Sequence, residues 1–198
     1  MKLKFFFLSI VLSLFMQLAP FMLFAQDKPK NPTLEESVFS IRDKKVFVGN
    51  TLVDKADAES FQILNALCHG DEDKHCFGKD KKRVYYYSRE IPNSDPITFK
   101  LLGEGYSSDK KNVYYIMENI FLVIKGANSK SFEVVGSSGN GYSYAKDKNF
   151  AYYDGVQLKG SDGKSFTLIQ GEGKYNAKDK KNYYKGSQVI PIKQRKGR

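Results

Sequence analysis

The sequence is short of the residues from which most catalytic and metal-binding sites are built, with two cysteines, two histidines and no tryptophan among 198 residues. It contains no Gly-x-Ser-x-Gly elbow for a nucleophilic serine and no His-Glu-x-x-His zinc motif. Both histidines lie in one short segment with the cysteines, so a histidine-dependent serine nucleophile has little support. We therefore expect a protein that is not an enzyme and that needs no cofactor.

Long apolar runs are also scarce, and the one that stands out covers residues 5–25. Lys2 and Lys4 precede it and a polar stretch begins at Gln26, which is the layout of a secretory signal peptide (residues 1–25) cleaved after Ala25. The run is also long enough to span a bilayer as an uncleaved anchor. In both interpretations the rest of the chain lies outside the cytoplasm, in the periplasm, the cell envelope or the extracellular space.

The remainder of the chain divides into three parts. Residues 26–39 hold two prolines and several charges, which is typical of a flexible linker. Residues 40–192 are rich in the aromatic and β-branched residues that favour strands, and we expect them to form the folded domain. Residues 193–198 add four positive charges as a disordered basic tail, in a chain whose formal net charge is +10.

Internal repetition is the strongest signal in this sequence. An Asp-Lys motif followed by aromatic residues recurs with Asp-to-Asp spacings of 37, 29, 38 and 32 residues. The copies cover residues 43–48, 80–86, 109–115, 147–153 and 179–184, and the last four contain a tyrosine pair. A second element, which reads Asp or Asn, two variable residues, Ser or Thr, and Phe, lies at residues 57–61, 95–99, 128–132 and 162–166.

These motifs predict short strands joined by turns. An aspartate can bond its own backbone two residues on, so Asp-Lys-Lys-Asn favours a turn, whereas Val-Tyr-Tyr favours a strand. Because neighbouring strand residues face opposite sides, one tyrosine of each pair should pack inward and the other should lie at the surface. Gly155 and Gly186 then supply a second turn, and a Gly-x-Gly element before the Asp-Lys motif recurs at residues 103–105, 139–141 and 171–173.

About three short strands per repeat are too few to bury a face alone, so stacked repeats must share a core. We therefore predict an all-β fold: a tandem array of about five short β-meander or hairpin repeats, either a solenoid-like stack or a small propeller-like closure. The best helical candidate is residues 57–67, but the repeat pattern makes part of this segment a strand. The apolar residues 121–124 predict a short buried strand.

The Asp-Lys-Asn-Tyr-Tyr pattern resembles the motif of the DKNYY family of bacterial exported repeat proteins. The resemblance covers roughly residues 40–192, with a first copy that lacks the tyrosine pair and a fifth that lacks the Phe strand, as degenerate caps do. The biochemical function of this family is unknown. The resemblance therefore implies a fold and carries over no catalytic residue.

One segment outside the repeats holds Cys68, His69, His75 and Cys76. Because an exported chain folds in an oxidising compartment, we expect a Cys68–Cys76 disulfide that closes an inserted loop and contributes ~2–3 kcal/mol. The alternative is a zinc site, although the spacing matches no common zinc motif and adjacent ligands are sterically awkward. An envelope metalloprotein or enzyme centred on this loop is the corresponding alternative function.

Lysines of the repeated turns are the candidate binding residues. If equivalent turns align in a stack, these lysines form a basic ridge with tyrosines nearby, which suits an anionic envelope polymer or a glycan. The ridge comprises Lys81, Lys82, Lys110, Lys111, Lys146, Lys148, Lys180 and Lys181. Our first hypothesis is still a non-enzymatic extracytoplasmic protein-interaction module, because no acid, base and nucleophile set can be assembled. Neither a specific nucleic acid partner nor a transmembrane domain after signal cleavage is predicted.

Overall fold

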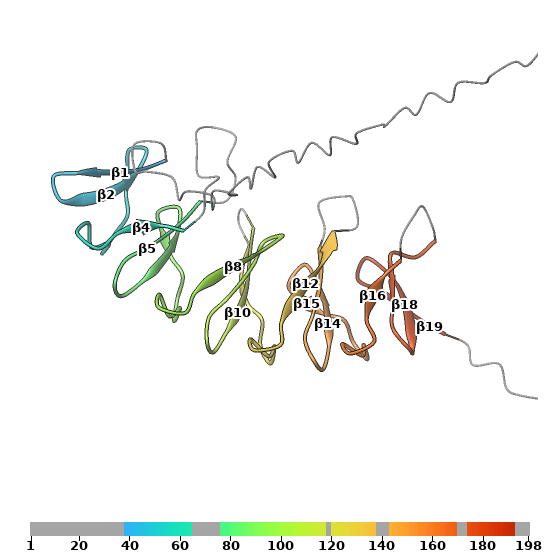
Figure 1. Cartoon of the computed structure of the whole chain (residues 1–198). Coiled ribbons are helices and arrows are strands. Elements are labelled where there is room, and N and C mark those ends of the chain that lie inside the picture. The colour runs from blue at the N-terminus through green and yellow to red at the C-terminus, as the bar shows by residue number, and fades with distance from the viewer. Residues whose placement is uncertain (1–37, 65–75, 118–119, 138–142, 170–173, 193–198) are drawn as a thin grey trace, which may run out of the picture.

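The computed structural model describes residues 38–64, 76–117, 120–137, 143–169 and 174–192. These residues form five antiparallel sheets and contain no helix. Figure 1 shows the sheets side by side in chain order, from the blue to the red end of the chain, as an open array. The predicted all-β tandem array is therefore confirmed, and it is an open stack rather than a propeller-like closure.

Each sheet is one repeat, and its strands are neighbours in chain order. Repeat 1 contains β1 (Phe39–Arg42), β2 (Lys45–Val48) and β3 (Thr51–Leu52). Repeat 2 contains β4 (Gln62–Ile63), β5 (Phe77–Lys79), β6 (Val84–Tyr86) and β7 (Arg89–Glu90). Repeat 3 contains β8 (Lys100–Gly103), β9 (Tyr106–Ser108), β10 (Val113–Met117) and β11 (Ile120–Val123).

The last two repeats have the same layout. Repeat 4 contains β12 (Glu133–Ser137), β13 (Ser143–Lys146), β14 (Ala151–Tyr153) and β15 (Val156–Gln157). Repeat 5 contains β16 (Thr167–Leu168), β17 (Ala177–Lys178), β18 (Asn182–Lys185) and β19 (Gln188–Pro191). We call β4, β8, β12 and β16 the leading strands, and β3, β7, β11, β15 and β19 the trailing strands.

Strand pairing fixes where each repeat begins. The Phe element directly precedes a leading strand, and that strand pairs with the hairpin of the next Asp-Lys motif along the chain. The fifth copy is therefore complete, because Phe166 and β16 belong to it. Repeat 1 has three strands rather than four. It begins at Phe39, a residue predicted to lie in the linker, whose fully buried side chain packs against repeat 2.

The core consists of four hydrophobic clusters, one at each junction between repeats. Tyr114 faces repeat 2 and Tyr115 faces repeat 4, and both are buried. Tyr85 and Tyr86 divide between two junctions in the same way. The prediction that the second tyrosine lies at the surface is wrong for these repeats, because the next repeat covers the face toward which it points.

An aromatic chain runs through these junctions. The ring of Tyr106 in repeat 3 lies 5.4 Å from that of Phe132 in repeat 4, and Phe132 lies 5.3 Å from Tyr152 of its own repeat. The same three-ring arrangement occurs at the junctions of repeats 2 with 3 and 4 with 5. In repeat 5 the position of Tyr106 is taken by Asn176. At this position the last face of the array is therefore more polar than the equivalent faces of repeats 3 and 4, which the next repeat covers.

Two further predictions are tested by the strands. Residues 121–124 were predicted to be a buried strand, but β11 is the outermost strand of its sheet, and Leu122 and Val123 are 40% and 46% exposed. Of this apolar run only Ile124 is buried. In the segment 57–67, residues 62–63 form β4, which confirms the strand; residues 65–67 lie outside the described part of the chain.

Ser107 in β9 provides a test of core packing. Its buried hydroxyl has no hydrogen-bond partner in the described part of the chain, and the equivalent residues of the other repeats are Gly78, Ala145 and Ala177. We expect Ser107→Ala to raise the free energy of unfolding by about 1 kcal/mol, because a buried hydroxyl without a partner is removed. Urea unfolding measures this, and a loss of stability would instead indicate that the hydroxyl is bonded.

Candidate functional site

The motif aspartate is the centre of each repeated turn. Asp147 is only 2% exposed, and its Oδ1 accepts the backbone N–H groups of Asn149 and Phe150 at 2.7 and 2.8 Å. Its Oδ2 accepts the Asn128 N–H and the Tyr152 hydroxyl, both at 2.8 Å. The carboxylate therefore holds the turn, the Phe element and the strand together with four hydrogen bonds.

The same arrangement occurs in the other complete repeats, which confirms the predicted Asp turn. Asp80, Asp109 and Asp179 each accept the N–H groups two and three residues on. Each also accepts the hydroxyl of the tyrosine five residues on, at 2.5 to 2.9 Å. The hydroxyl of this tyrosine, which is the first of the pair in repeats 2 to 4 and the second in repeat 5, is thus used within the repeat and does not line the basic ridge.

A second aspartate lies at the start of the Phe element. Asp57 Oδ1 accepts both the N–H and the hydroxyl of Ser60, and the Ser60 Oγ accepts the N–H of Lys81 at 3.2 Å. The Lys81 amine then pairs with Asp57 Oδ2 at 2.8 Å. Asp95 and Asp162 form the same contacts in repeats 3 and 5.

These contacts lower the carboxyl pKa values. The lysine amine, followed by the Ser or Thr hydroxyl, lowers the pKa of Asp57, Asp95 and Asp162 to about 2 from 3.8. Burial alone would raise the pKa of Asp147, but hydrogen bonds from three backbone N–H groups and the Tyr152 hydroxyl outweigh it and keep the pKa below 3.8.

The direction of these shifts predicts acid sensitivity. Between pH about 4 and about 2 the unfolded carboxyls bind protons while the folded ones stay charged, so stability is retained above pH about 4 and falls as the pH drops toward 2. Thermal unfolding across this range at constant ionic strength measures the slope. We expect a shallower slope when Asp57, Asp95 and Asp162 are all changed to Asn, the residue at position 128 of repeat 4. A melting temperature independent of pH in the unchanged chain would contradict the assignment.

Four of the eight ridge lysines are in ion pairs. Lys81, Lys110 and Lys180 pair with the aspartates of the Phe elements at 2.5 to 2.9 Å, and Lys146 pairs with Glu133 at 3.2 Å. The other four are exposed and make no ion pair with a described residue. They are Lys82, Lys111, Lys148 and Lys181.

Carboxylates balance the charge of the basic ridge. The four motif aspartates lie in the same turns as the lysines, and four further carboxylates are in the ion pairs, so eight negative charges accompany eight positive ones. These eight lysines and eight carboxylates together carry no net charge, which weakens the long-range attraction that the lysines alone would exert on an anionic polymer.

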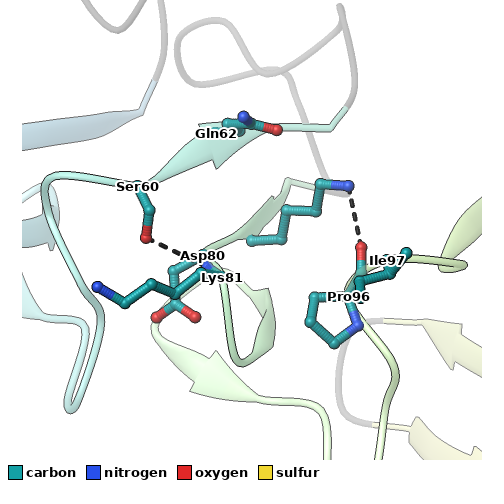
Figure 2. A pocket seen from close by; sticks show the side chains of 7 residues that line it. Ser60, Gln62, Asp80, Lys81, Pro96 and Ile97 are labelled. Atoms are coloured by element: carbon teal, nitrogen blue, oxygen red, sulfur yellow. Dashed lines mark hydrogen bonds between the residues drawn. The ribbon is translucent and has the colours of Figure 1, made fainter.

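A shallow pocket, lined in part by the ridge residue Lys81, lies where repeats 2 and 3 meet (Figure 2). Its volume is about 220 Å³, below the roughly 300–1,000 Å³ of most small-molecule sites. The Lys79 amine, which lines the pocket, donates to the Pro96 carbonyl at 2.9 Å and is therefore already hydrogen-bonded. The lining residues are Ser60, Gln62, Lys79, Asp80, Lys81, Pro96 and Ile97.

The cysteine segment is described at one end only. Cys76 is fully buried beside Val53 and Ile63, whereas Cys68, His69 and His75 lie outside the described residues. The Cys68–Cys76 disulfide and its zinc alternative therefore stay predictions. In the described ranges no three Asp, Glu, His or Cys side chains are grouped so that they could hold a metal ion.

The two chain ends are not among the described residues. Residues 1–37, with the predicted signal peptide and most of the linker, and the tail 193–198 lie outside the described part of the chain. Among the described residues, no helix is long and apolar enough to cross a membrane.

One surface feature was missed by sequence reasoning. Five of the seven large apolar side chains that are exposed in the described ranges lie on trailing strands. They are Leu52, Ile120, Leu122, Val123 and Val156. The leading strand β12 contacts β8 and β16 of the neighbouring repeats, so the trailing strands line the opposite side of the array. The sequence shows these residues as apolar, but it does not show which strands end a sheet.

The comparisons with known proteins agree with the architecture. No curated protein and no solved structure matches this chain. The model of the DKNYY family matches residues 39–188, which begin at β1 and end in β19 and so take in all five repeats. Because this match covers most of the sequence and the repeats that it spans are the ones that fold into the five sheets, the chain belongs to the DKNYY family.

Proposed function

We propose that this chain is a non-enzymatic, exported repeat protein that acts outside the cytoplasm as a protein-interaction module. The observation that carries the proposal is the concentration of exposed apolar side chains on the trailing strands. Single exposed apolar residues are normal on protein surfaces, but several on one side of an array are typical of surfaces that bind other proteins. Export rests on the signal peptide predicted for residues 1–25.

The repeated motif supports the proposal in a second way. In repeats 2 to 5 the motif aspartate and the tyrosine five residues on are joined by a hydrogen bond, and half of the ridge lysines are in ion pairs. The motif therefore builds the scaffold, and the remaining exposed surface is left for recognition. Repeat arrays commonly use their extended surfaces in this way.

Affinity capture from the cell envelope with the tagged mature chain, residues 26–198, tests the proposed function. Because an apolar protein interface is little affected by salt, we expect a defined protein partner to be retained at both low and high salt. A matched bait with Ile41 and Ile97 changed to Gln controls for non-specific adhesion, because these two exposed apolar side chains lie outside the trailing strands. Recovery of acidic polymers or lipids alone, lost at high salt, would contradict the proposal and favour the ridge lysines.

A further inference from the structure

We propose that β11 is a docking strand, to which an extended segment of a partner protein adds as a further strand of the repeat 3 sheet. This inference rests on the proposed function and names its surface and the kind of partner. In the sheet order β11-β10-β9-β8, β11 is outermost. An outermost strand presents backbone groups on its outer side, which another strand can pair with.

The register identifies which backbone groups point outward. The Ile124 N–H donates to the Val113 carbonyl at 2.8 Å, so position 124 is bonded toward β10. In antiparallel pairs the bonded and non-bonded positions alternate along the strand. Val123, which lies opposite Tyr114, and Phe121, which lies opposite Ile116, therefore direct their N–H and carbonyl groups toward the outer edge.

The other trailing strands are protected against such pairing. β7 consists of the charged residues Arg89 and Glu90, and β19 contains Pro191. Charges, proline and short length are the usual means by which edge strands avoid unwanted partners. β3 and β15 have two residues each, whereas β11 has four, without charge or proline. β11 is thus the trailing strand that is open to addition.

The side chains of β11 indicate the chemistry of the partner. Ile120 and Leu122 are 46% and 40% exposed and share one face of the strand, so a partner strand with apolar residues on that face would cover them. The Arg89 guanidinium lies over the Phe121 ring at 4.8 Å, and the exposed Lys125 follows the strand. Neither cation is in an ion pair with a described residue, and Glu118 lies outside the described ranges. We infer a partner segment of alternating apolar residues flanked by Asp or Glu.

A proline substitution separates backbone pairing from apolar contact. Val123→Pro removes an outward N–H while keeping an apolar side chain, and Val123→Ile keeps both. Gln157→Pro is the matched control, because Gln157 holds the equivalent place opposite Tyr152 in repeat 4 and its N–H also points outward. Thermal unfolding of the three variants verifies that each remains folded, as proline at an edge position should allow.

The probe is a phage-displayed library of random peptides, each about ten residues long, selected on the mature chain. We expect enriched peptides with alternating apolar residues and acidic flanks, whose affinity falls about tenfold or more for Val123→Pro and stays unchanged for Val123→Ile and Gln157→Pro. Selected peptides that bind Val123→Pro as well as the unchanged chain would overturn the inference, as would a selection without enrichment.

The capture experiment separates this inference from the proposed function. If the Val123→Pro bait retains the same envelope partner as the unchanged chain, the array is an interaction module but β11 is not its docking strand. If the unchanged chain captures no protein at high salt, the proposed function itself fails.

Discussion

Replacing Asp147 by alanine is expected to lower the free energy of unfolding by about 3–5 kcal/mol. The carboxylate accepts four hydrogen bonds, and its removal leaves the N–H groups of Asn128, Asn149 and Phe150 and the hydroxyl of Tyr152 without their acceptor. The site is buried, so water replaces these bonds only after local rearrangement. Equilibrium urea unfolding followed by circular dichroism measures the loss.

Two further variants keep this prediction testable if Asp147→Ala does not fold. Asp147→Asn retains one oxygen acceptor and the shape of the side chain, so we expect an intermediate loss. Asp54→Ala removes a carboxylate whose side chain is 79% exposed, and we expect almost no change. If Asp147→Ala and Asp54→Ala were equally stable, the buried carboxylate could not be the element that joins the turn to the Phe element.

Replacing Phe132 by alanine is expected to cost about 3–5 kcal/mol and to uncouple the two halves of the array. Phe132 belongs to repeat 4, but its ring contacts Tyr106 of repeat 3 as well as Tyr152 of its own repeat. Because repeats of such arrays are stabilised mainly by their nearest neighbours, a cavity at this junction weakens the link between repeats 1–3 and repeats 4–5.

Differential scanning calorimetry distinguishes uncoupling from a uniform loss of stability. We expect the Phe132→Ala protein to unfold in a broadened or two-step transition. For the unchanged chain we expect a single sharp transition. The control is Ile97→Ala, because the Ile97 side chain is 83% exposed and contributes little to any junction. A single sharp transition at a lower temperature would mean that the repeats stay coupled through other contacts.

The local chemistry of the repeats could be predicted from the sequence. The Asp turn depends on bonds between a side chain and the backbone two and three residues on, so residues 147–150 contain all that it needs. The number of repeats followed from the spacing of such motifs. Asp154 and Gly155 have positive φ values of 47° and 76°, which confirms the second turn expected at Gly155.

The candidate site was less predictable. The ridge lysines were identified as a basic surface, but the ion pairs of Lys81 with Asp57 and of Lys110 with Asp95 join residues 24 and 15 positions apart. Such pairs depend on how the Phe element folds against the turn. For the same reason the exposed apolar edge of β11 was first interpreted as a buried strand, since a run of apolar residues looks the same in both settings.

By itself the sequence determined the strand and turn chemistry, the five-fold repetition and the need for stacking, because these depend on short-range bonds and on the size of one repeat. The tertiary structure decided which strands share a sheet, why both Tyr114 and Tyr115 are buried, and which edge is left open. These features depend on what lies on the second face and at the outer edge of each sheet. Whether a side chain or a strand edge is covered is decided by the neighbouring repeat, and the residues next to it in the sequence do not show this.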